Sequence, residues 1–461
     1  MNNQIADSQI VSVRPSACPG LLRIAPALDG GICRIKLPCG RLTAIRAETI
    51  AGVAERYASG VIEITNRANL QLRGVAPATA DKLIEDLLAA GLGPQGGRGG
   101  DDVRNLLASP TLGIDVDAAL DVEPLALQIL DALQKQKRFH QLSPKFALSL
   151  DGGERTAMLE HPHDIWLSAM PNSDSLLAFG LAGCPPVAPG AAPALAAVTS
   201  EHALSLVEAA LQLFLELARP EQTRMRHLLN DISAAEFLRQ LQQRVSFSLL
   251  TDATIQQWRR VAALPYMHIG IHPQRQPHLR YVGAAPVLGR IDALQLRGLA
   301  QLAHEYGDAV LRFTPFQSVL LANIPAAATP LVATAMQSLG LSCDAAAVLT
   351  RTVACTGSSG CVRGAADTKS DALIFAAALA RLLPDRAIPA VHLSGCERSC
   401  AAAHIAPFTL LAVAPGYYNV FQRETAVAGF GLLLAAQLSV EAAAELLAGL
   451  FSKLPLSVEQ H

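Results

Sequence analysis

Four cysteines fall into two short pairs in the last quarter of the sequence. Cys355 and Cys361 are separated by five residues, and after a gap of 34 residues Cys396 and Cys400 are separated by three. Four thiolates from two loops are typical ligands of a [4Fe–4S] cluster. Structural zinc is the alternative, but zinc sites usually have tighter pairs on both sides. The pattern therefore predicts a cluster and electron transfer.

The residues that flank these cysteines are small. Thr356-Gly357-Ser358-Ser359-Gly360 fills the space between the first two, and Gly395 precedes the third. Small residues let backbone amides approach cluster sulfurs, where hydrogen bonds tune the reduction potential. The flanks therefore favour the cluster over four unrelated buried cysteines.

A second segment, residues 64–74, alternates polar and apolar side chains. Its polar members are Arg67, Asn69, Gln71 and Arg73. In a strand, residues two apart share a face, so these four are expected to form one polar row. Arginines make bidentate pairs with carboxylates, which suits a ligand with several acid groups. A solvated sheet face is the alternative, and it applies equally to Arg34 and Lys36 on either side of Ile35.

Two further motifs are weaker. Gly91-x-Gly93-x-x-Gly96 matches the dinucleotide fingerprint by letter. It follows a predicted helix rather than a strand and runs into more glycine, so we predict a loop and no nicotinamide-binding fold. His161, His163 and Asp164 have the residue types of a non-haem iron site. Pro162 between the histidines favours a surface turn instead.

The sequence contains an internal repeat. Shifted by 249 positions, residues 40–65 align without gaps and give eight identities over 26 positions. Each copy predicts a strand, a helix (44–57 and 293–306) and a second strand. Such a unit cannot close a core alone, but two copies paired in one sheet could. The elements that follow each copy have the same order, and only the second copy carries the four cysteines.

Composition narrows the class of protein. The chain has 461 residues, of which 51% are hydrophobic and 16% charged, so two to four domains are expected. A net charge of −2 provides no basic field for nucleic acid or a membrane surface. We find no run of 18 apolar residues and no secretion signal, and clustered cysteines suit a reducing compartment. We expect a cytoplasmic enzyme without nucleic-acid or membrane partners.

From Cys18 to about Val413 the chain resembles the sulfite and nitrite reductase superfamily. Ile64-Thr65-x-Arg67-x-Asn69-x-Gln71-x-Arg73-Gly74-Val75 is similar to the nitrite reductase strand that lies against sirohaem. Leu311-Arg312-x-Thr314-x-x-Gln317 is similar to its partner in the second repeat. Ala354-Cys355-Thr356-Gly357, Thr368-Lys369 and Ser394-Gly395-Cys396-x3-Cys400 are similar to the cluster loops.

Within that superfamily the chain most resembles the precorrin-3B synthases of aerobic cobalamin biosynthesis. The matching segments are residues 14–20, 29–38, 273–277 and 281–283. This resemblance implies a monooxygenase that uses precorrin-3A, O2 and NADH, installs a hydroxyl group and closes a γ-lactone. It implies a [4Fe–4S] cluster, a further mononuclear non-haem iron and, because no nucleotide motif is present, a separate electron-donating reductase.

The resemblance implies an α+β fold, in which tandem ferredoxin-like half-domains pair with two α/β domains. Expected boundaries are 1–92 for the N-terminal segment and half-domain 1, 100–262 for the α/β domain without a cluster, 266–326 for half-domain 2, and 340–461 for the α/β domain with the cluster. Expected substrate-binding residues are Arg34, Lys36, Arg67, Asn69, Gln71, Arg73, Arg104, Lys145, Arg312, Gln317 and Lys369.

Three departures from the reductases stand out. The anion site of sulfite reductases draws on basic residues at four places, and the last of these is Ala147 here. The glutamine that usually follows the first-repeat arginine is Ala68. Between the last two cysteines, Glu397-Arg398 replaces the usual Pro-Asn. A missing cation should weaken stabilisation of a small anion. A sirohaem-dependent sulfite or nitrite reductase remains the first alternative. A non-catalytic iron–sulfur electron carrier is the second.

Overall fold

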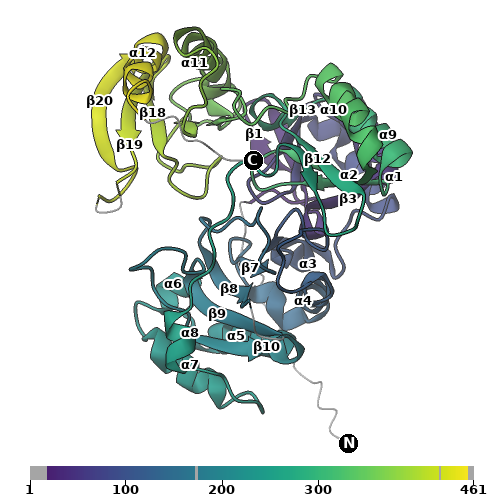
Figure 1. The fold of residues 1–461 in the computed structure, drawn as a ribbon. Coiled ribbons are helices and arrows are strands. Elements are labelled where there is room, and N and C mark those ends of the chain that lie inside the picture. Colours follow the sequence, from purple (N-terminus) through teal and green to yellow (C-terminus); the bar gives the residue numbers. More distant parts are fainter. Residues whose placement is uncertain (1–17, 172–174, 425–426, 455–461) are drawn as a thin grey trace, which may run out of the picture.

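The computed structural model describes residues 18–171, 175–424 and 427–454. Within them, four five-stranded sheets make up three lobes (Figure 1). Two sheets belong to a central unit, and each of the other two forms an α/β domain. Most of the 14–20 motif lies outside the described residues. None of the described helices is long and apolar enough to cross a membrane.

The central unit contains both copies of the repeat. The first copy comprises β1 Ala25–Ala27, β2 Gly30–Ile35, β3 Arg41–Thr43, α1 Ala44–Tyr57, β4 Ile62–Ile64, β5 Leu70–Val75 and α2 Ala80–Ala89. The second comprises β11 Gly270–Pro273, β12 Leu279–Ala284, β13 Arg290–Ile291, α9 Ala293–Tyr306, β14 Val310–Phe313, β15 Val319–Pro325 and α10 Thr329–Ser338. The ferredoxin-like halves and the α+β class expected from the sequence are thus confirmed.

The two copies exchange one short strand each. The sheet orders are β1-β2-β5-β4-β13 and β11-β12-β15-β14-β3. Strand β13 of the second copy pairs with β4, placing Arg290 opposite Glu63. Strand β3 of the first copy pairs with β14, placing Arg41 opposite Arg312. Each sheet is therefore completed by the other copy.

The repeat is longer than the sequence alignment indicates. Helices α1 and α9, and α2 and α10, begin and end at positions 249 apart. The turn before each exchanged strand has the same left-handed backbone, with φ of 71° at Gly40 and 72° at Gly289. A side chain at Gly40 would also collide with the carbonyl oxygen of Phe313. This close approach of the two copies requires glycine.

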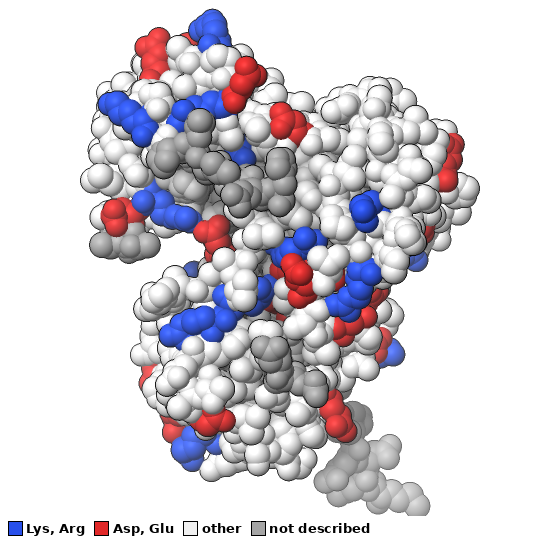
Figure 2. All heavy atoms as spheres, viewed as in Figure 1, with Lys and Arg blue, Asp and Glu red and all other residues white. Residues whose placement is uncertain are grey.

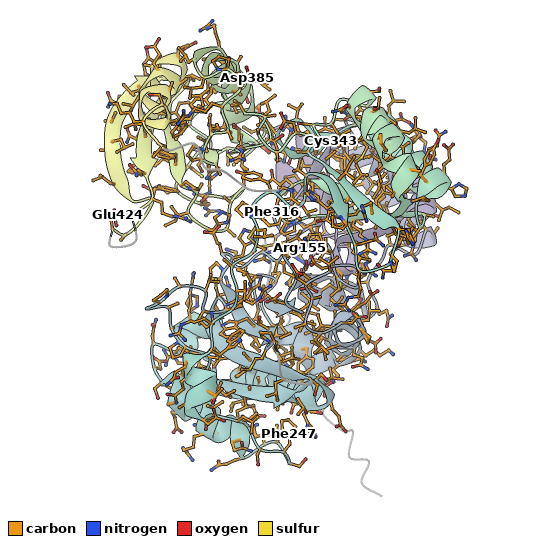
Figure 3. All side chains as sticks on the ribbon, in the orientation of Figure 1. Arg155, Phe247, Phe316, Cys343, Asp385 and Glu424 are labelled. Carbon is orange, nitrogen blue, oxygen red and sulfur yellow. The ribbon has the colours of Figure 1, made fainter. Side chains whose placement is uncertain are left out.

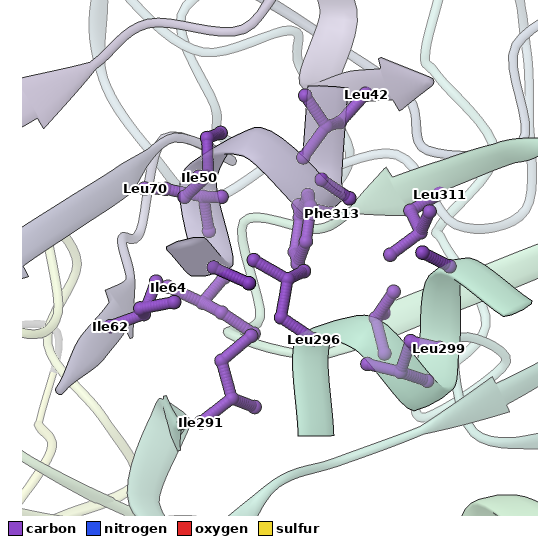
Figure 4. Packing of buried hydrophobic residues seen from close by; sticks show 14 of the residues in the cluster. Leu42, Ile50, Ile62, Ile64, Leu70, Ile291, Leu296, Leu299, Leu311 and Phe313 are labelled. Carbon is purple, nitrogen blue, oxygen red and sulfur yellow. The ribbon is translucent and has the colours of Figure 1, made fainter. Parts of the chain in front are cut away.

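A single core fills the space between the two copies. Ile62, Ile64 and Leu70 of the first copy belong to the same buried cluster as Leu296 and Leu299 of the second (Figure 4). Full burial of such a side chain stabilises a fold by roughly 1.5–3 kcal/mol. Residues Val332 and Met336 of α10 also join this core, so half-domain 2 extends past the expected limit at residue 326.

The two α/β domains share one topology. The first has β6 Leu106–Ala108, β7 Leu148–Asp151, β8 His163–Ala169, β9 Leu176–Gly183 and β10 Ala196–Thr199, with α3 Gly97–Val103, α4 Glu123–Lys135, α5 Ser200–Leu217, α6 Met225–Leu228, α7 Ala234–Gln242 and α8 Ala253–Gln257. The second has β16 Thr352–Ala354, β17 Val391–Ser394, β18 Phe408–Ala414, β19 Tyr417–Gln422 and β20 Leu432–Ser439, with α11 Thr368–Leu382 and α12 Val440–Phe451. In each sheet the first three strands are parallel and the last two antiparallel.

The glycine-rich segment after α2 differs from the expectation in one respect. It leads into the short helix α3 rather than into more loop. The element before it is a helix, so the strand that a dinucleotide fingerprint requires is still missing.

A helix cap distinguishes the two copies and can be tested. Asp292 and Gln295 form a capping box at the start of α9, whereas Thr43, at the equivalent position before α1, makes no side-chain cap. We expect Asp292→Ala to lower the free energy of opening the first turn of α9 by about 1 kcal/mol, because backbone N–H groups lose their acceptor. Hydrogen exchange by mass spectrometry measures this. Thr43→Ala is the matched control, and an equal loss in α1 would contradict the assignment.

Candidate functional site

The four cysteines lie at the ends of two neighbouring strands. Cys355 follows β16 and Cys396 follows β17, and these strands are parallel and hydrogen-bonded to each other. The carboxyl ends of adjacent parallel strands meet at one sheet edge. Cys361 and Cys400 come from the loops that follow. The topology therefore brings both sequence pairs to one edge of the C-terminal sheet.

Three glycines pack against one another behind these thiols. A Cβ atom on Gly395 would lie 3.2 Å from Cα of Gly364 and 3.3 Å from Cα of Gly357. The backbone N–H of Gly395 donates a hydrogen bond to Sγ of Cys355 at 3.2 Å. The hydroxyl of Thr368 lies 3.4 Å from the same sulfur. This surface is backbone rather than side chain, as a site with amide hydrogen bonds to sulfur requires.

The four thiols are close enough to influence one another. Partial burial raises the pKa of Cys400, and Cys396, Cys355 and Cys361 raise it further. Among the described residues, however, no three His, Cys, Asp or Glu side chains converge closely enough to hold a single metal ion. The four thiols and the backbone amides around them fit a [4Fe–4S] cluster.

A buried carboxylate, Glu63 of β4, connects the cysteine loop to both repeats. Its Oε1 accepts hydrogen bonds from Thr356 at 3.2 Å and from Arg290 at 2.9 Å. Its Oε2 lies 3.3 Å from Nη1 of Arg73. Burial acts to raise the pKa of Glu63, but Lys369, Arg73 and Arg290 outweigh it, so the pKa is lowered. Glu63 is thus held as a carboxylate.

Arg73 has different neighbours from those expected of a substrate-binding residue. It is 4% exposed, and its guanidinium forms two hydrogen bonds to Asp29, at 2.7 and 2.8 Å. It also donates to the carbonyl oxygen of Gly360 at 3.4 Å. Arg73 therefore anchors the loop between Cys355 and Cys361.

The turn of residues 65–69 lies next to the loop that carries Cys400. The Oγ1 of Thr65 accepts from the backbone N–H groups of Arg67 and Asn69. The side chain of Asn66 then reaches the carbonyl oxygen of Cys400 at 3.3 Å. The equivalent turn of the second copy behaves alike, because Gln317 donates to the carbonyl oxygen of Ala401 at 3.2 Å. Both repeats hold the Cys400 loop.

A pocket opens beside this turn, between the central unit and the first α/β domain. It encloses about 460 Å³ of space, part of it open to solvent. Its lining residues are Lys36, Leu37, Pro38, Arg67, Asn69, Arg104, Asn105, Leu106, Leu107, Leu130, Gln134, Ala147, Leu148 and His163. Figure 2 shows lysines and arginines along the junction between the lower lobe and the two upper ones.

The pocket wall is cationic. It includes three basic side chains and no carboxylate. Burial lowers the pKa of Lys36 to about 7, and its Nζ donates to Oδ1 of Asn105 at 2.7 Å. Burial, with Arg224 and Arg34 nearby, lowers the pKa of Arg67 to about 10. Arg104 pairs with Asp101 at 3.0 Å, but its Nε is buried without a partner among the described residues. Such a wall suits an acidic ligand.

The other predicted ligand residues divide into two groups. Arg34 donates to Oε1 of Gln71 at 2.6 and 3.1 Å, which places both on the strand pair that leads to the pocket. Lys145, Arg312 and Lys369 do not line it. Lys145 is exposed. Arg312 donates to the carbonyl oxygen of Leu112, and Lys369 donates to those of Leu288 and Ala354.

Sequence reasoning missed some residues and misjudged others. Asn105 is not singled out by the sequence patterns, yet its side chain accepts from Lys36 and donates to three backbone carbonyls. The trio of His161, His163 and Asp164 is not a metal site, because Asp164 accepts from Arg224 at 2.8 Å. The histidines are not on a surface turn either, since both are 4% exposed. His163 instead lines the pocket.

The second copy contributes an aromatic side chain where the first has an arginine. Phe316 occupies the place in its turn that Arg67 holds in the first copy, and Figure 3 shows it near the junction of the lobes. Its ring stacks on His268, with centroids 4.3 Å apart and an interplanar angle of 6°. Nδ1 of His268 is in turn 2.8 Å from Oγ of Ser318. The duplicated turns therefore present different chemistry.

Comparison with protein families identifies the domains. The nitrite/sulfite reductase ferredoxin-like half-domain matches residues 26–90 and 272–339. The nitrite and sulphite reductase 4Fe-4S domain matches residues 99–249. That second match covers the α/β domain without the four cysteines, which has the same topology as the one that carries them.

Named proteins with similar sequences fall into two groups. A ferredoxin–nitrite reductase from Synechococcus elongatus is 29% identical over 82% of this chain and 76% of its own length. A ferredoxin–nitrite reductase from Zea mays is 29% identical over 81% of this chain and 68% of its own length. A precorrin-3B synthase from Sinorhizobium sp is 26% identical over 88% of this chain and 83% of its own length. The solved structure of Mycobacterium tuberculosis NirA protein covers 91% of this chain and 79% of its own, with a TM-score of 0.75 and 22% identity, which shows the shared fold.

The contacts of Arg73 predict a defect in the cysteine loop. We expect Arg73→Ala to reduce the iron and sulfide content of the purified protein and to speed iron loss to a chelator, because breaking a buried ion pair leaves uncompensated charge at a cost of roughly 3–5 kcal/mol. Arg297→Ala is the control, since Arg297 pairs with Glu55 on the exposed helix surface. Unchanged iron retention in Arg73→Ala would contradict this role.

The shifted pKa of Lys36 predicts pH-dependent ligand binding. Lys36 carries its charge below about pH 7 and loses it above. Affinity for uroporphyrin, a polycarboxylate porphyrin, should therefore fall between pH 6 and 8.5, by up to about tenfold for one lost charge pair. Fluorescence titration measures this. Lys36→Met should bind weakly at both pH values, whereas Lys145→Met should behave like the parent protein. A pH dependence that survives in Lys36→Met would refute the assignment.

Proposed function

Because this chain is built from the ferredoxin-like half-domains and α/β domains of nitrite and sulfite reductases, we propose that it is an iron–sulfur oxidoreductase acting on a tetrapyrrole as a precorrin-3B synthase. The reaction would hydroxylate precorrin-3A with one atom of O2 and close a γ-lactone from a ring acetate. The second oxygen atom leaves as water, which consumes two electrons and two protons.

The observation that supports this choice is the missing cation at the fourth basic position. Ala147 lines the pocket wall where sulfite reductases carry a further lysine, and the nearby Lys145 is exposed and outside the lining. Neutral His163 lines the same pocket. Reduction of a small anion depends on concentrated positive charge at the reacting atoms. The three cations that remain in the lining, Lys36, Arg67 and Arg104, suit pairing with several carboxylates of a macrocycle.

The proposed roles follow from the contacts. Cys355, Cys361, Cys396 and Cys400 would hold the cluster, which supplies single electrons when bound. Arg34, Arg67 and Arg104 would bind substrate acids, with Asn69 fixing the strand end through its hydrogen bond from the N–H of Leu37. Arg73 and Lys369 would act as anchors of the cysteine loop. NADH would be oxidised by a separate reductase.

The further non-haem iron has no fitting site in the described residues. No three His, Cys, Asp or Glu side chains there are arranged to bind one ion. The trio around His163 is excluded by the ion pair of Asp164 with Arg224. We therefore assign no step of the reaction to a mononuclear iron.

A sirohaem-dependent nitrite or sulfite reductase is the second candidate. The similarity to ferredoxin–nitrite reductases, at 29% identity, exceeds that to the precorrin-3B synthase. Sirohaem is also a polycarboxylate tetrapyrrole, so the same arginines would hold it as a cofactor rather than as a substrate. The two candidates therefore differ in which macrocycle stays bound. A simple electron carrier would not need the cationic pocket.

The absorption spectrum of anaerobically purified protein separates the candidates. We expect a broad visible absorption, about four inorganic sulfides per chain and no intense Soret band, because the cluster would be the resident chromophore. Supplied with precorrin-3A, a chemical reductant and ¹⁸O2, the protein should place labelled oxygen in the product. A Soret band with reduction of nitrite or sulfite by reduced methyl viologen would overturn the synthase assignment.

The variant Ala147→Lys sharpens the same test. In a synthase, the added lysine occupies pocket space and should weaken precorrin-3A binding without creating sulfite reduction. In a sulfite reductase it restores a cation beside the anion and should lower the KM for sulfite severalfold. Lys145→Met is the matched control and should alter neither reaction.

A further inference from the structure

Histidines gather where the first α/β domain meets the C-terminal one. His163 is the first residue of β8 and His161 lies two residues before it, whereas His404 lies in the loop between β17 and β18. His392 belongs to β17 itself. All lie outside the set of residues expected to bind substrate, and none of them belongs to the four-cysteine set. We refer to the succession of Glu160, His404, His161 and His163 as the line.

The inner end of the line is His163 in the cationic pocket. Its side chain is 4% exposed and lines the pocket together with Arg67. Burial, with Arg67 nearby, lowers the pKa of His163 to about 3, and Arg224 acts in the same direction. The imidazole is therefore neutral at physiological pH. A neutral imidazole donates a proton at one ring nitrogen and accepts one at the other.

The middle of the line crosses between the two domains. The rings of His161 and His404 lie with their centroids 5.1 Å apart. Burial lowers the pKa of His161 well below its usual value, and His404, His163 and Arg67 lower it further. His161 and His163 are two residues apart in the chain, so this step connects the pocket wall to the C-terminal domain.

The outer end of the line is a carboxylate that solvent reaches. Nε2 of His404 lies 3.7 Å from Oε2 of Glu160, whose side chain is 54% exposed. Arg423 holds the other oxygen of Glu160 at 2.6 Å. Burial lowers the pKa of His404, Glu160 opposes that shift, and Arg423 adds to it. The line thus runs from the protein surface to the pocket.

Unpartnered polar atoms accompany the line. Nδ1 of His404, both ring nitrogens of His392 and Oγ1 of Thr409 are buried without hydrogen-bond partners among the described residues. His392 and Thr409 are directly opposite each other in the β17–β18 register, and His404 is near enough to lower the pKa of His392. Buried polar atoms are normally satisfied by protein or by ordered water. Water molecules would bridge the gaps that the rings leave.

We infer that Glu160, His404, His161 and His163 form a proton route from solvent into the pocket. The inference rests on the proposed function, because hydroxylation with O2 and nitrite reduction both consume protons at the bound ligand. Each imidazole, directly or through water, takes a proton on one ring nitrogen and releases one from the other. Glu160 is reprotonated from solvent, and nothing along the route is oxidised or reduced. His161 and His404 do not line the pocket, so they act on the ligand only through His163.

The test uses the holoenzyme with the substrate that it turns over, precorrin-3A or nitrite. We expect His404→Ala to lower kcat by tenfold or more, because general acid–base steps contribute factors of this size and above. The KM should change less than twofold and the solvent deuterium isotope effect should increase. Added 4-methylimidazole should restore kcat by occupying the vacated space. Sulfide content and uroporphyrin affinity should match the parent protein, which shows that the fold is intact.

His202→Ala is the matched control, because His202 is also half-buried and stacked, on Phe247, but lies away from the pocket. Its kcat should be unchanged. A parental kcat in His404→Ala, or a loss that 4-methylimidazole does not restore, would overturn the proton route.

A catalysis-independent measurement covers the case in which neither substrate is turned over and the proposed function fails. A high-resolution crystal structure of the holoprotein should then show ordered water hydrogen-bonded to the rings of His404, His161 and His163 along the route. Dry packing there would overturn the route.

Discussion

The buried carboxylate of Glu63 is the contact on which the rest of the site depends. It lies on β4 of the first repeat, opposite Arg290 on the strand donated by the second. It also accepts from Thr356, the residue after Cys355. Charge at this point must be balanced, because an unpaired buried carboxylate is costly. Arg73 and Lys369 complete that balance, so the pairing of the repeats and the placement of the cysteine loop are held by one set of ion pairs.

The duplication preserves the fold and divides the chemistry. The sheets of the two α/β domains have the same strand order, but Ser109 follows β6 where Cys355 follows β16. The Ser109 hydroxyl bonds Thr156 at 2.9 Å, so a small hydroxyl network fills the equivalent edge. In the central unit, Arg67 faces the pocket and Phe316 takes its place in the second copy. Backbone geometry tolerates these exchanges because the turns depend on Thr65 and Thr314, which both copies retain.

Much of the fold could be read from periodicity. Helices 44–57 and 293–306 were predicted with the ends that the structure has, since apolar spacing marks them directly. The single polar row expected over residues 67–73 is not formed, because residues 65–69 make a turn and only Gln71 and Arg73 lie on β5. Alternation also does not indicate which carboxylates will pair with an arginine. Arg73 forms its ion pair with Asp29, which lies 44 residues earlier in the chain. Pro162 led to the prediction of a surface turn at His163, whereas strand β8 buries this side chain. An ion pair between residues far apart in the chain leaves no pattern in the local sequence from which it could be predicted.

The exchange of β3 and β13 has a consequence for the history of this architecture. A chain with one copy of the repeat would leave β4 without its outer neighbour and would expose the hydrophobic side of α1, as an isolated half. Association with an identical chain about a two-fold axis would supply both missing pieces, since the same surface serves each partner. The single polypeptide is thus organised as a covalently joined homodimer. Because each half completes the sheet of the other, the two can carry different site residues without losing the shared core, as the restriction of the four cysteines to the second α/β domain shows.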